Sequence, residues 1–382
     1  MKVAIAGGGT GGHIYPAVAV VERLAGADAH LKVVFVGTRR GLEKSIVPSL
    51  GYRIRHIAAR PLPGKKDLRL IPAALYALVG LAQSFLILLI ERPNVVVGTG
   101  GYASGPFVFA AAIAGLPTLL IEPNVIPGRT TMMLARFVDR VALGFQESVT
   151  YFRKGTNLRV TGVPVRASML APSRDEGIKK FGLDAARKTV LVFGGSSGAH
   201  SINRAFLDAA TTLQGRQDLQ FVVQTGRADY KWMAESLSPL EVSARVYPYI
   251  DAIGAAYRAS DLVVCRAGAS TITELAAFGL PSILVPYPHA TLSHQAENAR
   301  VLEARGAAVV IADRDLTGEV LARTIVSIID DRGRADTMSR SSGDAGKRDA
   351  SREIANHLLE LTKRNGRLAK LATVLGDICS AR

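Results

Sequence analysis

Short runs of β-branched and other apolar residues alternate along the chain with longer segments whose apolar residues recur at helical spacing. In the first half the expected strands are Val3–Ala6, Val33–Val36, Val95–Val97, Thr118–Ile121 and Arg140–Leu143. After Val160–Gly162 the pattern restarts, with expected strands at Thr189–Phe193, Gln220–Gln224, Arg245–Tyr247, Leu262–Cys265, Ser282–Val285 and Ala308–Ile311. Helical spacing marks segments between them, such as Ile14–Leu24 and Thr271–Ala277. This alternation predicts parallel, doubly wound sheets.

Both halves open in the same way, with a strand, a glycine-rich turn and a helix. The turns are Gly7–Gly12 and Gly194–Ala199. Two such units in tandem predict an α/β fold of two Rossmann-like doubly wound parallel-sheet domains that face each other across a cleft. We expect the first domain at residues 1–162, the second at 163–340, and a helical tail at 341–382 that packs back toward the first domain.

The segment Leu70–Ile90 holds 21 residues without a charge, which is long enough to span a bilayer. The segment contains Pro72 and lies inside a regular strand–helix alternation, and both features argue against a spanning helix. A buried crossover helix and a partly exposed, membrane-docking surface both stay open. Docking is favoured by basic residues nearby, since each gains about 1 kcal/mol beside an anionic leaflet. These residues are Arg53, Arg55, Arg60, Lys65, Lys66 and Arg69.

The net charge of +15 is spread unevenly along the chain. Residues 1–163 hold 19 Lys and Arg against 8 Asp and Glu, whereas the rest of the chain holds 28 against 24. A basic first half suggests a polyanionic partner, which could be nucleic acid, an anionic membrane or a phosphorylated substrate. The only cysteines, Cys265 and Cys379, exclude a disulfide framework and favour a reducing, cytosolic setting. The N-terminus shows no pattern of a secretory signal.

The first glycine turn also satisfies the G-x-G-x-x-G pattern, so a dinucleotide site must be considered. Glycines allow close backbone approach, and a helix N-terminus presents N–H groups to phosphate. An NAD site needs an acidic residue at the end of the second strand, where this chain has Arg39 and Arg40. Those arginines could instead bind the 2′-phosphate of NADP, so an NADP site stays possible. His13 follows the turn directly, and an ordinary pKa near 6.5 suits a base that takes a proton from an acceptor hydroxyl.

In the second half, a strand ends at Cys265 and a Gly-Ala-Ser-Thr turn starts a helix. Glu274 lies about one turn into that helix, where a carboxylate near phosphate needs a partner such as the hydroxyls of a ribose; a structural capping role stays open. Gln295 and Asn298 are three residues apart and share a helical face, with amides suited to sugar hydroxyls. The only D-x-D match, Asp313–Asp315, falls in a polar turn, so we expect no metal site.

Several motifs together resemble the MurG family of N-acetylglucosaminyltransferases, which make the final lipid-linked precursor of peptidoglycan. The matching stretches include Gly8–His13, Gly98–Tyr102, Glu122–Asn124, Gly162–Arg166, Gly194–Ser196, Ala269–Glu274 and Gln295–Asn298. The resemblance covers residues 1 to about 360 and implies a GT-B fold.

The resemblance also implies roles for individual residues. Arg166 and Ser196 would lie near the donor diphosphate, and Ile250 beside the uracil through its backbone. Phosphate and ribose would be held by Ala269, Ser270, Thr271 and Glu274, and the sugar would be read by Gln295 and Asn298. Further donor contacts would come from Thr10, Gly11, Gly12 and Asn124, and Tyr102 would line the acceptor side of the cleft. His13 would be the catalytic base.

The activity implied is inverting transfer of GlcNAc from UDP-GlcNAc to the 4-hydroxyl of undecaprenyl-diphospho-N-acetylmuramoyl-pentapeptide (lipid I), giving lipid II. No cofactor, metal or nucleic acid is expected. The partners would be UDP-GlcNAc, lipid I and an anionic membrane surface, with the protein peripheral on the cytoplasmic face of the bacterial inner membrane. A transferase with another lipid acceptor and a UDP-sugar epimerase remain the alternatives.

Overall fold

The computed structural model describes all residues except 10, 61–69, 291–292, 348 and 364–382. The chain forms two compact units. Unit 1 holds Met1–Arg166 together with the chain from Asp349 onward, and unit 2 holds Ala167–Arg348. Residues 341–347, which were expected in the tail, lie in unit 2, and the first five of them belong to helix α14 (Arg332–Ala345).

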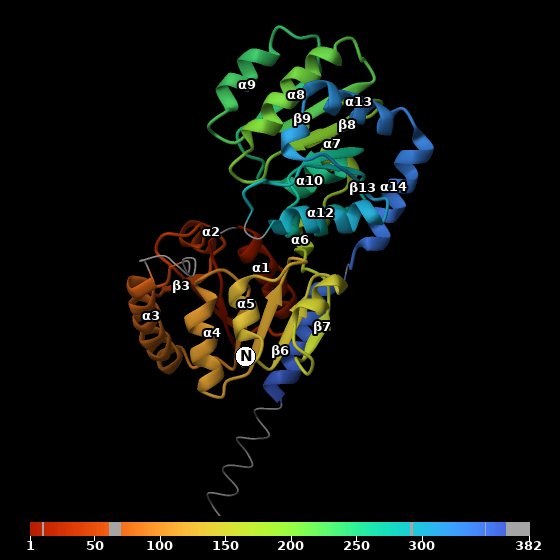
Figure 1. The fold of residues 1–382 in the computed structure, drawn as a ribbon. Helices are drawn as coiled ribbons and strands as arrows, with labels where there is room; N and C mark the ends of the chain where they lie inside the picture. The colour runs from red at the N-terminus through yellow and green to blue at the C-terminus, as the bar shows by residue number, and fades with distance from the viewer. Residues whose placement is uncertain (10, 61–69, 291–292, 348, 364–382) are drawn as a thin grey trace, which may run out of the picture. The chain divides into compact units, whose positions relative to one another are not determined.

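Unit 1 is built on a seven-stranded sheet in the order β3-β2-β1-β4-β5-β6-β7 (Figure 1). All its neighbouring strands are parallel. The order reverses between β1 and β4, and ligands of open α/β sheets bind outside the carboxyl ends of strands at such a reversal. The strands are β1 Lys2–Ala6, β2 Lys32–Gly37, β3 Arg53–His56, β4 Val95–Gly98, β5 Thr118–Glu122, β6 Arg140–Leu143 and β7 Leu158–Val160.

Unit 2 repeats this plan with a six-stranded parallel sheet in the order β10-β9-β8-β11-β12-β13, reversing between β8 and β11. The prediction of two Rossmann-like, doubly wound parallel sheets is therefore confirmed. The short strands β3 and β7 were not expected. The strands of unit 2 are β8 Lys188–Phe193, β9 Leu219–Gln224, β10 Ala244–Tyr247, β11 Leu262–Cys265, β12 Ser282–Leu284 and β13 Ala308–Val310.

Helices cover both faces of the first sheet, because side chains alternate between the faces of a strand. From β1, Val3 and Ile5 pack on one side, and Ala4 and Ala6 on the other. A helix at residues 350–363 belongs to the first of these cores, although it lies far along the chain. The other helices of unit 1 are α1 Gly11–Ala25, α2 Glu43–Ser49, α3 Leu70–Glu91, α4 Ser104–Ile113 and α5 Arg129–Leu134.

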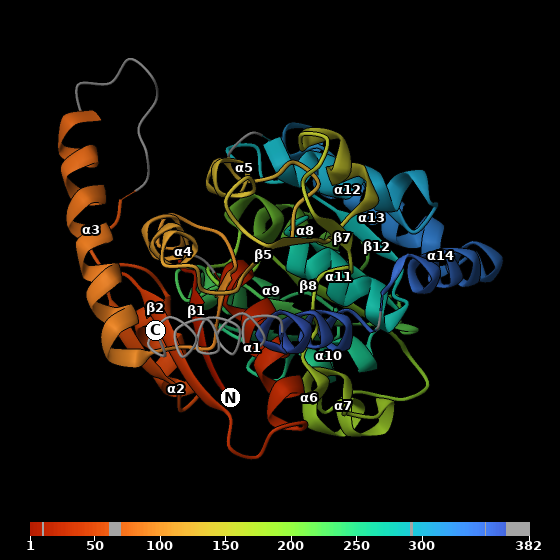
Figure 2. The same cartoon turned by 90° about the horizontal axis from the view of Figure 1, so that it is seen from below.

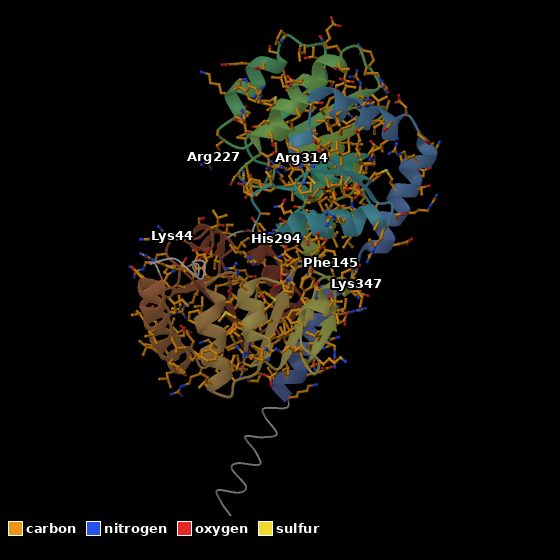
Figure 3. All side chains as sticks on the ribbon, in the orientation of Figure 1. Lys44, Phe145, Arg227, His294, Arg314 and Lys347 are labelled. Carbon is orange, nitrogen blue, oxygen red and sulfur yellow. The ribbon has the colours of Figure 1, made fainter. Side chains whose placement is uncertain are left out.

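The core of unit 2 gathers β-branched residues of the strands and aromatic residues such as Phe206 and Phe221. Figure 3 draws the side chains of the described residues on the ribbon. Local sequence sets the helix ends. Ser173 and Glu176 form a capping box at the start of α7, and Gly182 ends that helix in the left-handed conformation. The helices that precede α14 are α6 Ala167–Leu170, α7 Arg174–Phe181, α8 His200–Thr212, α9 Tyr230–Leu237, α10 Ile253–Ala259, α11 Ala269–Phe278, α12 His294–Ala304 and α13 Gly318–Ile329.

Helix α3 is buried on one side and exposed on the other, so it is not a fully buried crossover helix. One side packs on unit 1, where Ile87 and Leu88 are buried and Gly80 lies against the Ala58 carbonyl. On the other side, Leu86 and Leu89 are 57% and 71% exposed, and the helix lies at the margin of its unit (Figure 2). Among the described residues, no helix is long and apolar enough to cross a membrane.

Candidate active site in two glycine-rich units

In unit 1, the loops after the adjacent strands β1 and β4 interlock through glycines. A Cβ atom at Gly101 would lie 2.4 Å from the Gly8 carbonyl oxygen, and one at Gly100 would lie 2.8 Å from the His13 ring. Both glycines also have positive φ angles, of +74° and +92°, which other residues rarely adopt. The switch point of the sheet therefore brings the first glycine turn and the stretch 98–102 together.

His13 is fixed in one orientation at this junction. Its Nδ1 lies 2.7 Å from the Thr99 carbonyl oxygen, and because a carbonyl only accepts, Nδ1 carries the proton. In the neutral ring, Nε2 is then the acceptor. Burial lowers the pKa of His13, while Glu122, the bond to Thr99 and Glu43 act in the opposite direction without offsetting it. At neutral pH the ring is uncharged and can take up a proton.

Glu43, which the sequence analysis did not single out, braces the first glycine turn. One carboxylate oxygen accepts the Gly9 N–H at 2.9 Å, and the other accepts the N–H and hydroxyl of Thr38 at 2.8 and 2.9 Å. The residue is 1% exposed, and a Cβ atom at Gly8 would lie 2.5 Å from its carboxyl carbon. A carboxylate does therefore lie at the end of β2, supplied by α2, but backbone and hydroxyl donors already occupy it. One signal was available, since Glu43 is the only acidic residue between Asp28 and Asp67.

Glu122 plays a similar part at the end of β5. It is 2% exposed, and its oxygens accept the N–H of Gly128 at 2.9 Å and the side-chain amide of Asn124 at 3.3 Å. Asn124, expected at the donor, is thus oriented by a buried carboxylate. The Tyr102 ring lies beside Gly9, 3.6 Å from where a Cβ atom would stand. Of the other expected contacts in this region, Gly11 and Gly12 start α1, and Thr10 lies outside the described residues.

Arg166 lies in unit 1, whereas Ser196, its expected neighbour at the diphosphate, lies in unit 2. The Arg166 guanidinium stands 4.6 Å above the Tyr15 ring, and Tyr15 borders Gly11 at the start of α1. The Arg166 Nε is buried and has no hydrogen-bond partner among the described residues. A guanidinium with an unused donor beside a glycine turn is suited to an anion such as phosphate.

The glycine loop of unit 2 connects β8 to α8 and presents Ser196 at the surface. A Cβ atom at Gly198 would lie 2.0 Å from the Thr225 carbonyl oxygen, so only glycine fits there. Gln224 ties the loop to Ile250, because it donates to the Gly195 carbonyl at 2.8 Å and accepts the Ile250 N–H at 2.9 Å. A backbone contact from Ile250 to a base would therefore have to use its carbonyl group.

Helix α11 begins after Gly268 without a side-chain cap, and Ala269, Ser270 and Thr271 form its first turn. Glu274, one turn further on, accepts a hydrogen bond from the Tyr257 hydroxyl at 3.0 Å. Burial, followed by the charge of Glu274, raises the pKa of Tyr257 well above its ordinary value, so the hydroxyl stays protonated. The carboxylate is thus held at a fixed place near the start of the helix while remaining partly exposed.

The two amides expected to read the sugar differ in their surroundings. Gln295 is partly exposed, and its side-chain oxygen accepts the Tyr287 N–H at 2.9 Å. Asn298 is fully buried and donates to the Ala267 carbonyl at 3.5 Å, just before α11. The prediction that both residues lie on one helix is confirmed by α12. Because Asn298 is buried, its side chain supports the backbone that leads into α11.

Arg266 is a further residue that the sequence analysis passed over. Its guanidinium donates to the Val285 carbonyl at 3.2 Å and to the Ser201 hydroxyl at 2.9 Å, and it pairs with Asp313. It therefore joins the segment after β12, the start of α8 and the residues that follow β13, at the carboxyl ends of the second sheet. The D-x-D stretch, helix η3 (Asp313–Asp315), uses its first carboxylate in this network. Among the described residues, no group of three His, Cys, Asp or Glu side chains could hold a metal ion.

Comparison with known families agrees with this pairing of glycine-rich units. Residues 3–143 match the profile described as the glycosyltransferase family 28 N-terminal domain, and residues 189–356 match that of its C-terminal domain. The chain belongs to glycosyltransferase family 28. Within the family, it is 42% identical over 366 residues to the "UDP-N-acetylglucosamine--N-acetylmuramyl-(pentapeptide) pyrophosphoryl-undecaprenol N-acetylglucosamine transferase" of Syntrophus aciditrophicus, covering 95% of this chain and 99% of the relative. The enzyme of the same name from Desulforamulus reducens is 40% identical over 360 residues, covering 93% and 97%.

Solved structures support the fold of this family 28 chain. The crystal structure of Acinetobacter baumannii MurG matches with a TM-score of 0.75 and 26% identity, covering 94% of this chain and 99% of that one. The resemblance to the MurG family and the GT-B fold class are thereby confirmed. A UDP-GlcNAc 2-epimerase from Neisseria meningitidis, solved with UDP-GlcNAc, matches with a TM-score of 0.66 at 14% identity, covering 94% and 100%. At that identity the match concerns the fold alone.

Proposed function

We propose that this chain transfers GlcNAc from UDP-GlcNAc to the 4-hydroxyl of an N-acetylmuramoyl-pentapeptide carried on pyrophosphoryl-undecaprenol, with inversion at the sugar carbon. Relatives about 40% identical along nearly their whole length carry this activity in their names. The observation that carries the proposal is the orientation of His13, whose Nδ1 proton is directed to Thr99 and whose Nε2 is left as the acceptor.

The reaction needs one proton transfer and one displacement. The acceptor 4-oxygen attacks C1 of GlcNAc from the face opposite UDP, and the bond from C1 to the β-phosphate oxygen breaks, so UDP leaves with the electron pair. The proton of the 4-hydroxyl passes to Nε2 of His13. A base with a pKa below that of ordinary histidine is ready in its neutral form at pH 7.

Unit 2 supplies the chemistry for the donor. The N-terminal ends of α8 and α11 offer N–H groups to the diphosphate, with Ser196, Ala269, Ser270 and Thr271 at those ends. Glu274 holds the ribose hydroxyls, and Gln295 reads the sugar. From unit 1, Arg166 would stabilise the leaving diphosphate, and Asn124 and Gly11 would supply further donor contacts. Because arginine and helix ends supply the positive charge, we expect catalysis without a divalent metal.

The acceptor reaches the protein from an anionic membrane. The chain binds peripherally to the cytoplasmic face of that membrane. The exposed apolar side of α3 and the basic excess of the first half support this proposal. Of the basic residues first considered, Arg53 is exposed and Arg55 pairs with Glu91 at 2.7 Å, while Lys65, Lys66 and Arg69 lie outside the described residues.

The decisive experiment measures UDP release from UDP-GlcNAc by the purified protein, with and without a soluble analogue of the lipid-linked acceptor, and with and without EDTA. Release that requires the analogue and continues in EDTA is expected. Release abolished by EDTA would refute the metal-independent mechanism. Conversion of UDP-GlcNAc with no acceptor present would favour an epimerase, and release only with a different polyprenyl-linked sugar would replace the muramoyl acceptor.

A further inference from the structure

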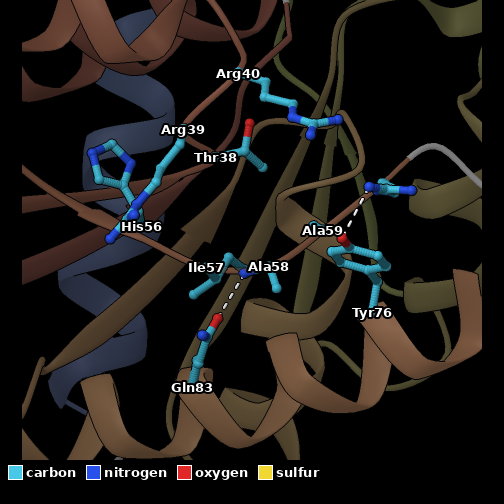
Figure 4. Close-up of a pocket in the computed structure, with 10 residues that line it drawn as sticks. Thr38, Arg39, Arg40, His56, Ile57, Ala58, Ala59, Tyr76 and Gln83 are labelled. Atoms are coloured by element: carbon cyan, nitrogen blue, oxygen red, sulfur yellow. Dashed lines mark hydrogen bonds between the residues drawn. The ribbon is translucent and has the colours of Figure 1, made fainter. Parts of the chain in front are cut away.

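A cavity of about 320 Å³ opens in unit 1 at the carboxyl ends of β2 and β3, and none of the residues assigned above lines it (Figure 4). Arg39 and Arg40 reach it from the end of β2, and His56 and Arg60 from β3 and the residues that follow. On the side of α3, Gln83 accepts the Ala58 N–H at 2.7 Å and so fixes the wall.

The described lining of this cavity carries three arginines and no carboxylate. No ion pair among the described residues involves Arg39 or Arg40. Glu43 is the nearest acidic residue along the chain, but its carboxylate is occupied by Gly9 and Thr38. Figure 4 shows Arg39 running toward His56 and Arg40 extending toward the side where Tyr76 lies. Among the described residues, positive charge therefore gathers here without a partner of the kind that Arg55 finds in Glu91.

Two further features indicate a built site. Arg60 donates to the Tyr76 hydroxyl at 2.9 Å and lies 3.9 Å from the centre of its ring, which holds the guanidinium in place before any ligand arrives. The His56 Nδ1 is buried and has no hydrogen-bond partner among the described residues. Buried polar atoms are rarely left without a hydrogen bond, so we expect a bound ligand to supply a partner for this nitrogen.

The chemistry of the lining selects the ligand. Guanidinium groups bind phosphate oxygens through paired N–H donors, and three of them suit the charge of a diphosphate better than that of a single phosphodiester. Tyr76 is also the first of the described exposed large apolar side chains of α3, which continue with Leu78, Val79, Leu86, Leu89 and Ile90. At 1.5 Å per residue, this apolar stripe extends roughly 20 Å from the cavity. A diphosphate joined to a long apolar chain matches both surfaces.

We propose that this cavity binds the diphosphate of the isoprenoid-linked acceptor, with the isoprenoid chain along the exposed side of α3. The inference rests on the proposed function, since it assigns the end of the acceptor that does not react. The anionic headgroup of a membrane phospholipid offers similar phosphate chemistry, and the experiment has to separate these two sources.

The test compares Arg39→Ala/Arg40→Ala with Arg153→Ala/Arg159→Ala, which removes two charges from exposed positions elsewhere in unit 1. The probe is farnesyl diphosphate, titrated calorimetrically without donor. We expect roughly 10- to 100-fold weaker binding in the first variant, as for the loss of charged hydrogen bonds, and unchanged binding in the control. The KM for the lipid-linked acceptor should rise in parallel, while the KM for UDP-GlcNAc stays constant. Arg39→Lys/Arg40→Lys, which keeps the charge, should recover part of the affinity.

Vesicle sedimentation with phosphatidylglycerol supplies the second arm. If Arg39→Ala/Arg40→Ala loses vesicle binding but binds farnesyl diphosphate as the wild type does, the cavity serves a phospholipid headgroup and the proposal is overturned. Unchanged farnesyl diphosphate binding together with unchanged vesicle binding overturns it as well. Because the titration needs no turnover, a wild-type protein that binds the probe but releases no UDP would refute the proposed function alone.

Discussion

At the scale of single residues, two buried carboxylates shape the region around His13. Glu43 holds the first glycine turn and Glu122 holds the loop after β5, and both charges raise the pKa of His13 against the effect of burial. The sequence motif identified His13, because a histidine after a glycine turn stands out. It could not identify Glu43, whose role depends on the glycines at positions 8, 37 and 41 leaving space for its carboxylate.

Glu43→Gln should destabilise the protein and slow the reaction. All three groups that contact the carboxylate are donors, so the amide nitrogen of glutamine would face at least one of them. Loss of a buried charged hydrogen bond costs about 1.5–3 kcal/mol, which urea unfolding will measure. Glu319→Gln is the control, since that residue is 83% exposed and its ion pair with Arg323 spans 3.9 Å. Equal stability of the two variants would contradict the bracing role.

His13→Ala should lower kcat by roughly 10²–10⁴, the usual contribution of a general base. The pKa of His13 is lowered, so the neutral ring persists to a lower pH than in ordinary histidine. The rate should therefore fall only as pH drops below about 6.5 and stay level above it. This acidic limb should disappear in His13→Ala and persist in His30→Ala, an exposed histidine of the same unit. A loss below tenfold in His13→Ala would leave His13 a structural role.

At the scale of elements, the pattern predicted the central strands and the edge strands β10 and β13, but it missed the edge strands β3 and β7. The central strand β8 is buried along nearly its whole length and appeared as an apolar run. The strand β3 lies at the edge of its sheet, and of its four residues, Arg53 to His56, only Ile54 is apolar. An edge strand pairs on one side only and needs less apolar surface, so the hydrophobic pattern does not mark β3. Its arginines were interpreted only as a basic surface.

The sequence pattern predicted a helix near residues 354–361 but not which core residues of unit 1 this helix packs against. Ile354, Ala355, Leu358 and Leu361 enter a core of unit 1, and Arg140 donates to Glu360 at 2.9 Å. Leu358→Ala should therefore destabilise unit 1 by about 2–5 kcal/mol, as expected for a buried leucine. The free energy of unfolding can be measured by urea titration, with proteolytic cleavage within the N-terminal half used to detect the unfolding of unit 1. Glu353→Ala, at a partly exposed site on the same helix, should cost far less, and a similar loss in both would indicate that the helix contributes little to the core.

At the scale of the whole molecule, the chain leaves unit 1 after Arg166 and returns to it at Asp349. Repetition of strand, glycine turn and helix predicted the two sheets. The distribution of roles between the units was harder to predict, because it depends on where the chain crosses. Arg166 illustrates this: the family resemblance implied a place near the donor diphosphate together with Ser196, and the structure assigns Arg166 to unit 1, where its guanidinium stacks on Tyr15.

The membrane docking that we propose would involve unit 1 as a whole, because this unit combines an exposed apolar helix with a basic first half. Leu86→Glu/Leu89→Glu places two negative charges on the exposed side of α3, where each faces the anionic leaflet instead of entering it. Sedimentation with phosphatidylglycerol vesicles should fall at least about tenfold, since lost apolar burial and added repulsion act together. The control Tyr151→Glu/Tyr230→Glu adds the same charge at positions 45% and 40% exposed on other elements. If both variants lose binding equally, net charge alone governs the association and α3 is not the docking surface. A selective loss, with turnover of a soluble acceptor retained, would assign membrane binding to α3 independently of catalysis.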